Sequence, residues 1–407
     1  MTPIVCGITK RLHFSESEWW SRILPAMKVL IPILEVLLLL AGSQSLQAAM
    51  ETVLRVGPGQ AHTRLATAVS VAKDGDTIEI DARGNYRGDV CLIRASKLTL
   101  RGVGKGRAKF PAAGKSYGRK GIWVVSGNDV TIENIEFSGV RVSDKNGAGI
   151  RSEGRDITIR NCRFHDCENG ILGGAGVVRI EHCEFSHCGL DGRSHNLYIS
   201  KADQLIFQFN NSHHAQMGHL LKSRARENHI RYNYFSDGQD GSSSYVINLP
   251  NGGRSVLVGN ILCQGPRTGN STMVAYGEEG NLHPGSALYL VNNTLVNNRH
   301  TSVFINAKRL PAGFRLVARN NIFSGRGTVC NWPQAMLGGN FSGGDPLFID
   351  RARFDFRLRK GSPCIDKGID PGTAGSLSLR PLYHYAHPPT KLKRPQVGVV
   401  DVGAFEF

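Results

Sequence analysis

Short stretches in which apolar and polar residues alternate recur along most of the chain, and long amphipathic helical patterns are nearly absent. In the repeated unit an apolar residue is followed three positions later by Asn or Cys, and two positions after that by another apolar residue, as in "ITIRNCRF" and "VRIEHCEF". The central residues of these units lie 21 to 33 residues apart: Ile135, Cys162, Cys183, Asn210, Asn233, Asn260, Asn293 and Asn321. A fixed motif separated by loops of variable length is typical of a solenoid.

The alternation within each unit predicts short β-strands rather than helices. Strands that recur once per unit predict the coils of a parallel β-helix, in which successive coils stack about 4.8 Å apart. A recurring Asn fits this architecture, because its amide can bond to the same residue in the coils above and below and so satisfy the polar groups it buries. The pattern therefore predicts an all-β parallel β-helix.

Cysteines take part in the same repeat. Cys162 and Cys183 occupy the central position, and Cys167 and Cys188 follow each of them after five residues. We expect two stacked pairs of free, buried thiols, since Cys packs as a small hydrophobe. A disulfide between neighbouring coils is an alternative, because the distance between two stacked coils lies within the range of Cα–Cα distances that a disulfide permits. Zinc binding is a third, and the histidines that could assist are His165, His182 and His187.

The two ends of the solenoid have patterns of their own. "AHTRLATAVSVAKDGDTIEI" predicts a helix with Leu65, Ala68, Val69 and Ala72 on one face, followed by a strand over 77–80. Such a helix would cap the open end of the β-helix and protect its strand edge. We place the β-helix at 49–370 and a C-terminal cap or tail at 371–407, where the segment 380–396 is Pro-rich and basic.

The N-terminal region predicts export. Lys28 precedes an apolar run over 29–40 that gives way to small residues, which indicates a signal peptide over 27–48. The run is too short to cross a bilayer, so we expect no stable membrane insertion. Glu35 interrupts it, and an amphipathic anchor is the alternative. We expect Met27 to be the true start, residues 1–26 to be absent from the mature protein, and the product to be periplasmic or secreted.

The chain carries a formal net charge of +16, of which the first 48 residues contribute only +1. A field of this sign attracts polyanions such as nucleic acid, anionic lipid or an acidic polysaccharide. Export argues against nucleic acid, so the expected partner of this predicted monomer is an acidic polysaccharide. The alternative is that the charge only keeps the protein soluble.

The capping helix running into "DGDTIEI", the asparagine repeat and the ending "DPLFID...FRLRKGSPCIDKG...VGVVDVGAFEF" resemble the pectate-lyase-like superfamily of right-handed parallel β-helix proteins. The resemblance covers residues 52–407. It implies the fold but leaves the activity open, since this fold carries lyases, hydrolases, epimerases, adhesins and proteins without a known reaction.

A narrower resemblance begins at Lys222. "KSRARENHIRYNYFSDGQDG" is similar to a region of the lyases that include chondroitinase B and the β-helical alginate lyases. It implies that Lys222 is a Brønsted base, that an Arg one coil further assists, and that calcium held by acidic residues neutralises the uronate carboxylate. Here Pro250 stands near the expected Arg, and "SHHAQMG" at 212–218 replaces the acidic pair. We therefore assign no metal ligands and leave calcium open.

The residues around Lys222 suit proton removal beside a carboxylate, which requires a base and a cationic group. Counting nine positions back from the first apolar residue of each unit gives a column of apolar residues that includes Tyr198 and Leu221, which we expect to point inward. Lys222 would then point outward, between Ile199 and Asn248 on the neighbouring coils. We predict Lys222 or His219 as the base and Arg224 as the bidentate partner of the carboxylate. The expected substrate-binding residues are His195, Asn196, Tyr198, His214, Arg226, Tyr245, Asn248 and Asn251.

The resulting hypothesis is an exported protein that acts on an acidic, uronate-containing polysaccharide by β-elimination or C5 epimerisation. Whether it is an enzyme stays open, because a non-catalytic polysaccharide-binding or matrix-assembly protein would use the same surface. A glycoside hydrolase is a further alternative that needs two carboxylates at a defined separation. The candidate carboxylates are Glu227, Asp237, Asp240, Glu278 and Glu279, and their spacing sets no pair on one face.

Overall fold

The computed structural model describes residues 52–407, which form one compact unit. The predicted signal peptide and the expected start at Met27 lie outside the described residues. Within the described part, no helix has both the length and the apolar character needed to span a bilayer.

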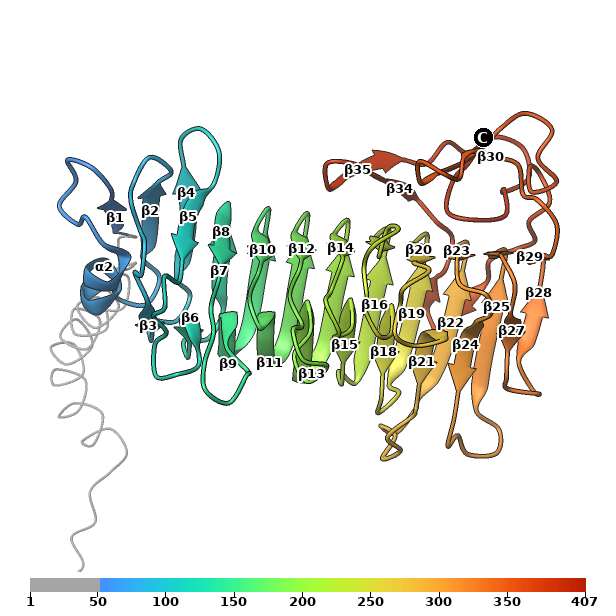
Figure 1. The fold of residues 1–407 in the computed structure, drawn as a ribbon, viewed down its shortest axis with the longest axis horizontal. Helices are drawn as coiled ribbons and strands as arrows, with labels where there is room; N and C mark the ends of the chain where they lie inside the picture. The colour runs from blue at the N-terminus through green and yellow to red at the C-terminus, as the bar shows by residue number, and fades with distance from the viewer. Residues whose placement is uncertain (1–51) are drawn as a thin grey trace, which may run out of the picture. The chain divides into compact units, whose positions relative to one another are not determined.

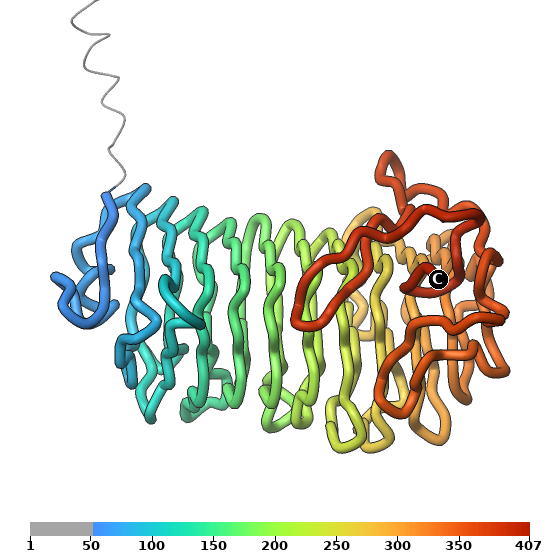
Figure 2. Tube along the Cα trace, turned by 90° about the horizontal axis from the view of Figure 1, so that it is seen from above, coloured from blue at the N-terminus to red at the C-terminus, as the bar shows by residue number. Residues whose placement is uncertain are grey.

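The chain from residue 53 to 342 winds into stacked coils whose strands form three parallel rows along one axis (Figures 1 and 2). The first row consists of β3 (Cys91–Ile93), β6 (Gly121–Val125), the first parts of β9 (Ala148–Arg160), β11 (Asn169–Glu181) and β13 (Leu197–Gln208), then β15 (Leu221–Ser223), β18 (Ile247–Leu249), β21 (Thr272–Tyr276), β24 (Val303–Ala307) and β27 (Thr328–Cys330). The second row consists of β1 (Val53–Val56), β2 (Thr77–Asp81), β4 (Thr99–Val103), β7 (Val130–Glu133), the second parts of β9, β11 and β13, then β16 (Glu227–Arg231), β19 (Arg254–Val258), β22 (Ala287–Val291), β25 (Arg315–Arg319) and β28 (Met336–Gly338). The predicted parallel β-helix is confirmed.

The third row forms a separate sheet on another side of the coils. It consists of β5 (Ala108–Pro111), β8 (Ile135–Ser138), β10 (Arg163–His165), β12 (Glu184–Ser186), β14 (Asn211–His213), β17 (Tyr234–Ser236), β20 (Ile261–Gln264), β23 (Thr294–Asn297), β26 (Ile322–Ser324) and β29 (Phe341–Ser342). Alternate residues of all three rows point into a continuous apolar core, to which Phe137, Phe164 and Phe185 contribute stacked rings.

The helix predicted at the N-terminal end is present as α2 (Leu65–Val71), and its Leu65 and Ala68 pack into the core (Figure 1). It is shorter than the pattern suggested, because Ala72 adopts an extended conformation with ψ of 142°. The backbone N–H of Leu65 donates to Asp89 Oδ2 at 2.6 Å, which satisfies a group that the first turn of a helix leaves free. The strand β1 precedes the helix and had no sequence prediction.

The asparagine ladder is confirmed. From Asn210 to Asn321, each amide Nδ2 donates to the side-chain oxygen of the next ladder Asn at 2.9–3.1 Å, and the backbone N–H of the same residue donates to that oxygen at 2.9–3.0 Å. The last partner is Asn340, which the sequence pattern missed. The residue before each ladder position turns with positive φ, for example 57° at Phe209 and 55° at Tyr232, so its side chain points away from the core.

The four cysteines of the repeat are free and buried, as expected. Cys162 and Cys183 stack within the ladder, where the backbone N–H of Cys162 lies 3.4 Å from Cys183 Sγ. Burial raises the pKa of the Cys183 thiol well above its usual value. Cys183 therefore packs against Cys162 as a small apolar group.

After β29 the chain leaves the coils and folds back along their outside, and we call residues 343–407 the tail (Figures 1 and 2). The tail contains three antiparallel hairpins, formed by β30 (Phe348–Asp350) with β31 (Asp355–Leu358), β32 (Thr373–Ala374) with β33 (Leu377–Ser378), and β34 (Tyr383–Ala386) with β35 (Thr390–Lys393). The coils thus end before residue 370, the boundary expected from sequence. The segment 380–396 lies along the side of the coils, since its Tyr383 stacks edge-on against Phe209 and Tyr232.

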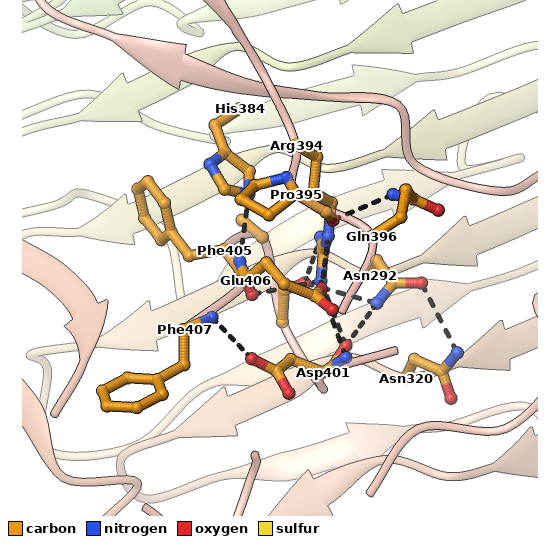
Figure 3. Close-up of polar contacts among 12 residues, drawn as sticks. Asn292, Asn320, His384, Arg394, Pro395, Gln396, Asp401, Phe405, Glu406 and Phe407 are labelled. Atoms are coloured by element: carbon orange, nitrogen blue, oxygen red, sulfur yellow. Dashed lines mark hydrogen bonds and ion pairs between the residues drawn. The ribbon is translucent and has the colours of Figure 1, made fainter. Parts of the chain in front are cut away.

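A buried ion pair locks the end of the tail (Figure 3). The guanidinium of Arg394 donates to Glu406 Oε2 at 2.8 Å and to the carbonyl oxygens of Asp401, Gly403 and Phe405 at 3.1–3.2 Å. Asn292, which precedes a ladder position, donates to the Asp401 carbonyl at 2.7 Å. The coil and the tail are therefore joined by hydrogen bonds as well as by packing.

Candidate functional site

The three rows differ in what lies outside them. In the second row, outward residues such as Val258, Val291 and Val317 form an apolar cluster with Leu379 of the tail. In the third row, Ile261 and others form a second cluster with tail residues. The first row instead presents Tyr198, Lys222, Asn248, Ala275 and Asn306 in register from coil to coil. We call the outward side of β13, β15, β18, β21 and β24 the Lys222 face.

The register corrects one prediction. Tyr198, expected to point inward, pairs with Lys222 and points outward, whereas Leu197 and Ile199 are buried. The count of nine positions failed because β13 holds one extra residue: Ala202 and Gln204 pair with the consecutive residues Gly176 and Val177, which leaves Asp203 as a bulge. Tyr198 and Asn248 are therefore the neighbours of Lys222.

Lys222 and Arg224 hold one carboxylate between them. Lys222 Nζ lies 3.4 Å from Glu279 Oε1, and Arg224 Nη2 lies 2.6 Å from Glu279 Oε2. Tyr198 supports both cations, since its hydroxyl accepts a hydrogen bond from Arg224 Nε at 2.6 Å and its ring centroid lies 5.1 Å from Lys222 Nζ. Arg224 Nη1 also donates to the side-chain oxygen of Asn251. This arrangement fixes two positive groups in the geometry that a carboxylate requires.

Glu279 belongs to the loop between β21 and β22, residues 277–286, which is fixed to the coil below it. The backbone N–H of Glu279 donates to the Pro250 carbonyl at 3.2 Å, and Asn251 Nδ2 donates to the Gly280 carbonyl at 2.9 Å. His283 Nε2 donates to the carbonyl of Arg224 at 2.9 Å. The loop backbone therefore has a defined position relative to the two cations.

The pKa values of the charged groups reflect this contact. Burial alone would raise the pKa of the Glu279 carboxyl, but the nearby Arg224 and Lys222 outweigh it and the pKa is lowered. The Arg224 pKa is raised, because its bonds to Tyr198 and Glu279 outweigh its burial. The carboxylate and the guanidinium are thus both charged at neutral pH.

The neighbouring Glu278 contacts the same face nearer to the C-terminal end. Asn306 Nδ2 donates to Glu278 Oε1 at 3.2 Å. Burial and then Glu278 raise the pKa of the Tyr245 hydroxyl to about 12, so it stays protonated as a donor. Two consecutive carboxylates of one loop are therefore bound at two positions on the Lys222 face.

Four other carboxylates in residues 52–407 also lie between two Arg or Lys side chains: Glu79, Glu153, Glu181 and Asp203. Their cations are 28–68% exposed, which distinguishes these sites from Glu279. Glu79 lies between Arg55 and Arg101, whose side chains are 61% and 47% exposed. The side chains of Lys222 and Arg224 are only 14% and 23% exposed. The Lys222 face therefore binds its carboxylate in a less solvated environment, where charge interactions are stronger.

His195 and His219 form a short ladder at the corner before the first row. Their rings stack with centroids 4.3 Å apart, His195 Nδ1 accepts the backbone N–H of His219 at 3.0 Å, and His219 Nδ1 accepts that of Tyr245 at 3.2 Å. Burial lowers the pKa of His219 to about 3. With Nδ1 accepting, the single proton of the neutral ring is on Nε2. His219 therefore has no vacant lone pair, which argues against the base role expected from sequence.

Three further candidates lie away from the Lys222 face. Asn196 is buried, and its amide donates to Ser212 Oγ at 3.1 Å and to the His213 carbonyl at 3.0 Å inside the coil. His214 follows the third row, where its Nε2 lies 3.2 Å from Asp240. Arg226 is 68% exposed and approaches Asp203. We leave these three residues out of the candidate site, which keeps Lys222, Arg224, Tyr198, Tyr245, Asn248 and Asn251.

Glu278, Glu279 and His283 complete the site, and the sequence analysis did not place them beside Lys222. From the sequence the two glutamates are candidates only for metal binding or for the acid and base of a hydrolase, and His283 is not a candidate. The available signal was "YGEEG", in which Gly277 and Gly280 have φ of 76° and 69°, so a tight turn displays the two acids directly after a first-row strand.

Within residues 52–407, no three His, Cys, Asp or Glu side chains come together in an arrangement that could hold a metal ion. The structure does contain a cavity of about 430 Å³ elsewhere, between the tail and the third row, lined by aromatic residues that include Tyr234, Tyr385 and Phe405. Its acidic and basic side chains already pair with each other, for example Asp355 with Arg357 at 2.5 Å. We therefore place the candidate chemistry at Lys222.

A sequence model described as the right-handed β-helix region matches residues 93–193 and 171–333. The chain belongs to the right-handed β-helix family. No curated protein matches the sequence. Among solved structures, the pectate lyase Pel9A is similar over 88% of this chain and 97% of its own, with 14% identity and a TM-score of 0.64. A rhamnogalacturonan lyase is similar over 76% and 93%, with 12% identity and a TM-score of 0.48. At these identities the likeness concerns the fold alone, a right-handed parallel β-helix.

Proposed function

We propose that this protein binds an acidic, uronate-containing polysaccharide on the Lys222 face and acts on it by β-elimination or C5 epimerisation. The observation that carries the proposal is the joint binding of one carboxylate by Lys222 and Arg224. A uronate presents the same group, so its carboxylate would take the place of Glu279. The pectate lyase of similar fold is named for an acidic polysaccharide, which supports this class of partner.

The residues around the pair suit the chemistry of proton removal beside a carboxylate. Arg224, held by Tyr198 and Asn251, would neutralise the carboxylate and stabilise the charge that develops when the C5 proton leaves. In the chemical step Arg224 would hold the carboxylate, and Lys222, on a rigid strand one coil from Tyr198, would first lose its own proton to solvent and then take the C5 proton as a neutral amine. The Tyr198 hydroxyl accepts from Arg224, so its O–H would be directed at another acceptor, such as a leaving oxygen in an elimination. Epimerisation would need a proton returned to the opposite face of the sugar.

A non-catalytic binding protein is the second candidate, and two observations favour it. Glu279 already neutralises both cations, and His219 has no lone pair with which to act as a base. Such a protein would bind the polymer through the same groups and leave it unchanged. In either case we expect a periplasmic or secreted monomer, in keeping with the sequence of residues 27–48.

The proposed function is tested with polygalacturonate, alginate and chondroitin sulfate. Elimination would produce the ultraviolet absorbance of an unsaturated uronate, and epimerisation in heavy water would place deuterium at C5. We expect one of these signals, and we expect Lys222→Ala to lower its rate at least about 100-fold, the low end of what a general base contributes. Binding without either signal would support the non-catalytic candidate, and absence of binding to every acidic polymer would contradict the proposal.

A further inference from the structure

The side chain that occupies the Lys222–Arg224 pair belongs to the protein itself. Glu279 offers both carboxylate oxygens to the pair, and its side chain is 46% exposed, far more than either cation. The carboxylate of the preceding residue, Glu278, also contacts the Lys222 face, where its partners are Tyr245 and Asn306. An acidic dipeptide therefore lies where the proposed function places the carboxylates of a polyuronate.

We propose that Glu279 is an intramolecular competitor for the Lys222–Arg224 pair, which lowers the affinity of every acidic ligand by the same factor and so leaves only polymers, with their additional contacts, bound at low concentration. This inference rests on the proposed function. It assigns to Glu279 a role in specificity and no role in the chemical step.

The contacts of the loop explain why a single sugar would fail to compete. The backbone at Glu279 is fixed by its bond to Pro250, and the bonds of Asn251 and His283 hold the loop on either side. The carboxylate can therefore move only by rotation of its own side chain. A group tethered in this way acts at an effective concentration of about millimolar or more. A monomeric uronate in solution offers one carboxylate against it.

A polymer has contacts that a monomer lacks. The first row continues in register from Lys222 through Tyr198 and Leu172 to Arg151, whose side chain is 28% exposed. A chain along this row would add contacts at these positions and so offset the loss of the Glu279 contact. Displacing Glu279, whose side chain is 46% exposed, weakens a monomer and a polymer by the same factor of about five, and only the polymer has further contacts that offset this loss.

The test compares wild type with Glu279→Gln, which removes the competing charge and keeps the shape. Binding of D-galacturonate, its short oligomers and polygalacturonate is measured by calorimetry at fixed salt. We expect Glu279→Gln to bind the polymer about fivefold more tightly, the upper end of the value of an exposed ion pair, and to bind shorter oligomers than wild type does. The matched control is Glu79→Gln, because Glu79 also bridges two cations but lies in the second row. Glu79→Gln should change neither the affinity for the polymer nor the length of the shortest oligomer that binds.

Each outcome is decisive. Equal or weaker binding of the polymer and the oligomers by Glu279→Gln would overturn the inference while leaving the proposed function in place, and weaker binding would mean that Glu279 holds the sugar. An equal gain in Glu79→Gln would also overturn it, since the effect would then come from net charge. If neither wild type nor Glu279→Gln binds any polyuronate, the proposed function and the inference both fail.

Discussion

The tail-covered face and the Lys222 face come from the same coils and differ in what their outward residues contact. In β19, Val256 and Val258 point outward and meet the tail. In β18, on the same coil, Asn248 points outward beside Lys222 and Tyr198. Strand alternation is the same on both faces. The difference shows that the tail covers outward apolar residues of the second row such as Val258, whereas outward residues of the first row around Lys222 hold a carboxylate.

The largest effect is expected on the tail-covered face. Arg394→Ala would leave Glu406 buried without its partner, because the side chains of Arg394 and Glu406 are only 0% and 4% exposed. Removing one member of a buried ion pair typically costs about 3–5 kcal/mol. We expect a loss of this size in the free energy of unfolding, measured by chemical denaturation. The control is Arg353→Ala, a tail residue 88% exposed, which should cost about 0.5 kcal/mol or less. Similar losses in both variants would mean that the tail is not locked by this pair.

In β15, two consecutive residues point to opposite sides of the strand, one into the core and one outward. Leu221 is buried, and Leu221→Ala should lower the free energy of unfolding by about 2–5 kcal/mol. Lys222 points outward, and Lys222→Ala should change it by about 0.5 kcal/mol or less. Denaturation curves of the two variants check this. A stable Leu221→Ala and an unfolded Lys222→Ala would show that the two sides of the strand are exchanged.

Acid should weaken the corner that carries the Lys222 face. The folded-state pKa of His219 is lowered to about 3, below the usual value of about 6.5 in the unfolded chain, so the unfolded chain binds more protons between these values. Stability therefore falls as the pH drops through this window, by about 2 kcal/mol at pH 5 for this residue. His219→Asn keeps an acceptor for the Tyr245 N–H, as Asn169 does for His195, and should remove about this much of the acid sensitivity. If wild type and His219→Asn lose the same free energy of unfolding between pH 7 and pH 5, the lowered pKa assigned to His219 would be contradicted.

Added salt should weaken polymer binding at the Lys222 face and leave the packing of the tail-covered face intact, and this effect should be smaller than those above. Binding of a polyuronate to the Lys222 face depends on charge, and the Debye length falls from about 10 Å at 0.1 M salt to about 3 Å at 1 M. We expect weaker retention on an immobilised polyuronate at the higher salt and no retention on a neutral glucan. The apolar contacts of the tail should not weaken, so the unfolding midpoint should stay constant or rise. Equal retention of both polymers would contradict binding by charge.

The coils could be predicted from the sequence because their signal is local and repeated. The ladder from Asn210 to Asn321 has a fixed motif around each member, whereas Asn340 was missed because Ser342 stands where the repeated unit has its second apolar residue. Tyr198 was misplaced by a single extra residue, Asp203, which no periodic count could detect. Such a bulge changes the face of each residue that precedes it in the count.

The parts that the sequence did not predict depend on contacts between distant segments. Glu279 meets Lys222 across 57 residues, through a loop with no periodicity. Arg394 and Asn292 are joined only through the folded tail. The basic residues near Lys222 were visible in the sequence, but which of them point to the same face depends on the register and on the position of the loop.

The central claim is that the Lys222 face, rather than the positive surface as a whole, binds the acidic polymer. Its most direct test is the affinity of wild type, Lys222→Ala and Arg101→Ala for the same polyuronate at one salt concentration. Both variants lose one positive charge that pairs with a glutamate, and Arg101 lies on the second row. We predict that Lys222→Ala weakens binding at least about tenfold, as expected for a charged hydrogen bond, and that Arg101→Ala stays within about twofold of wild type. Equal losses in the two variants would contradict the account and assign binding to the overall charge.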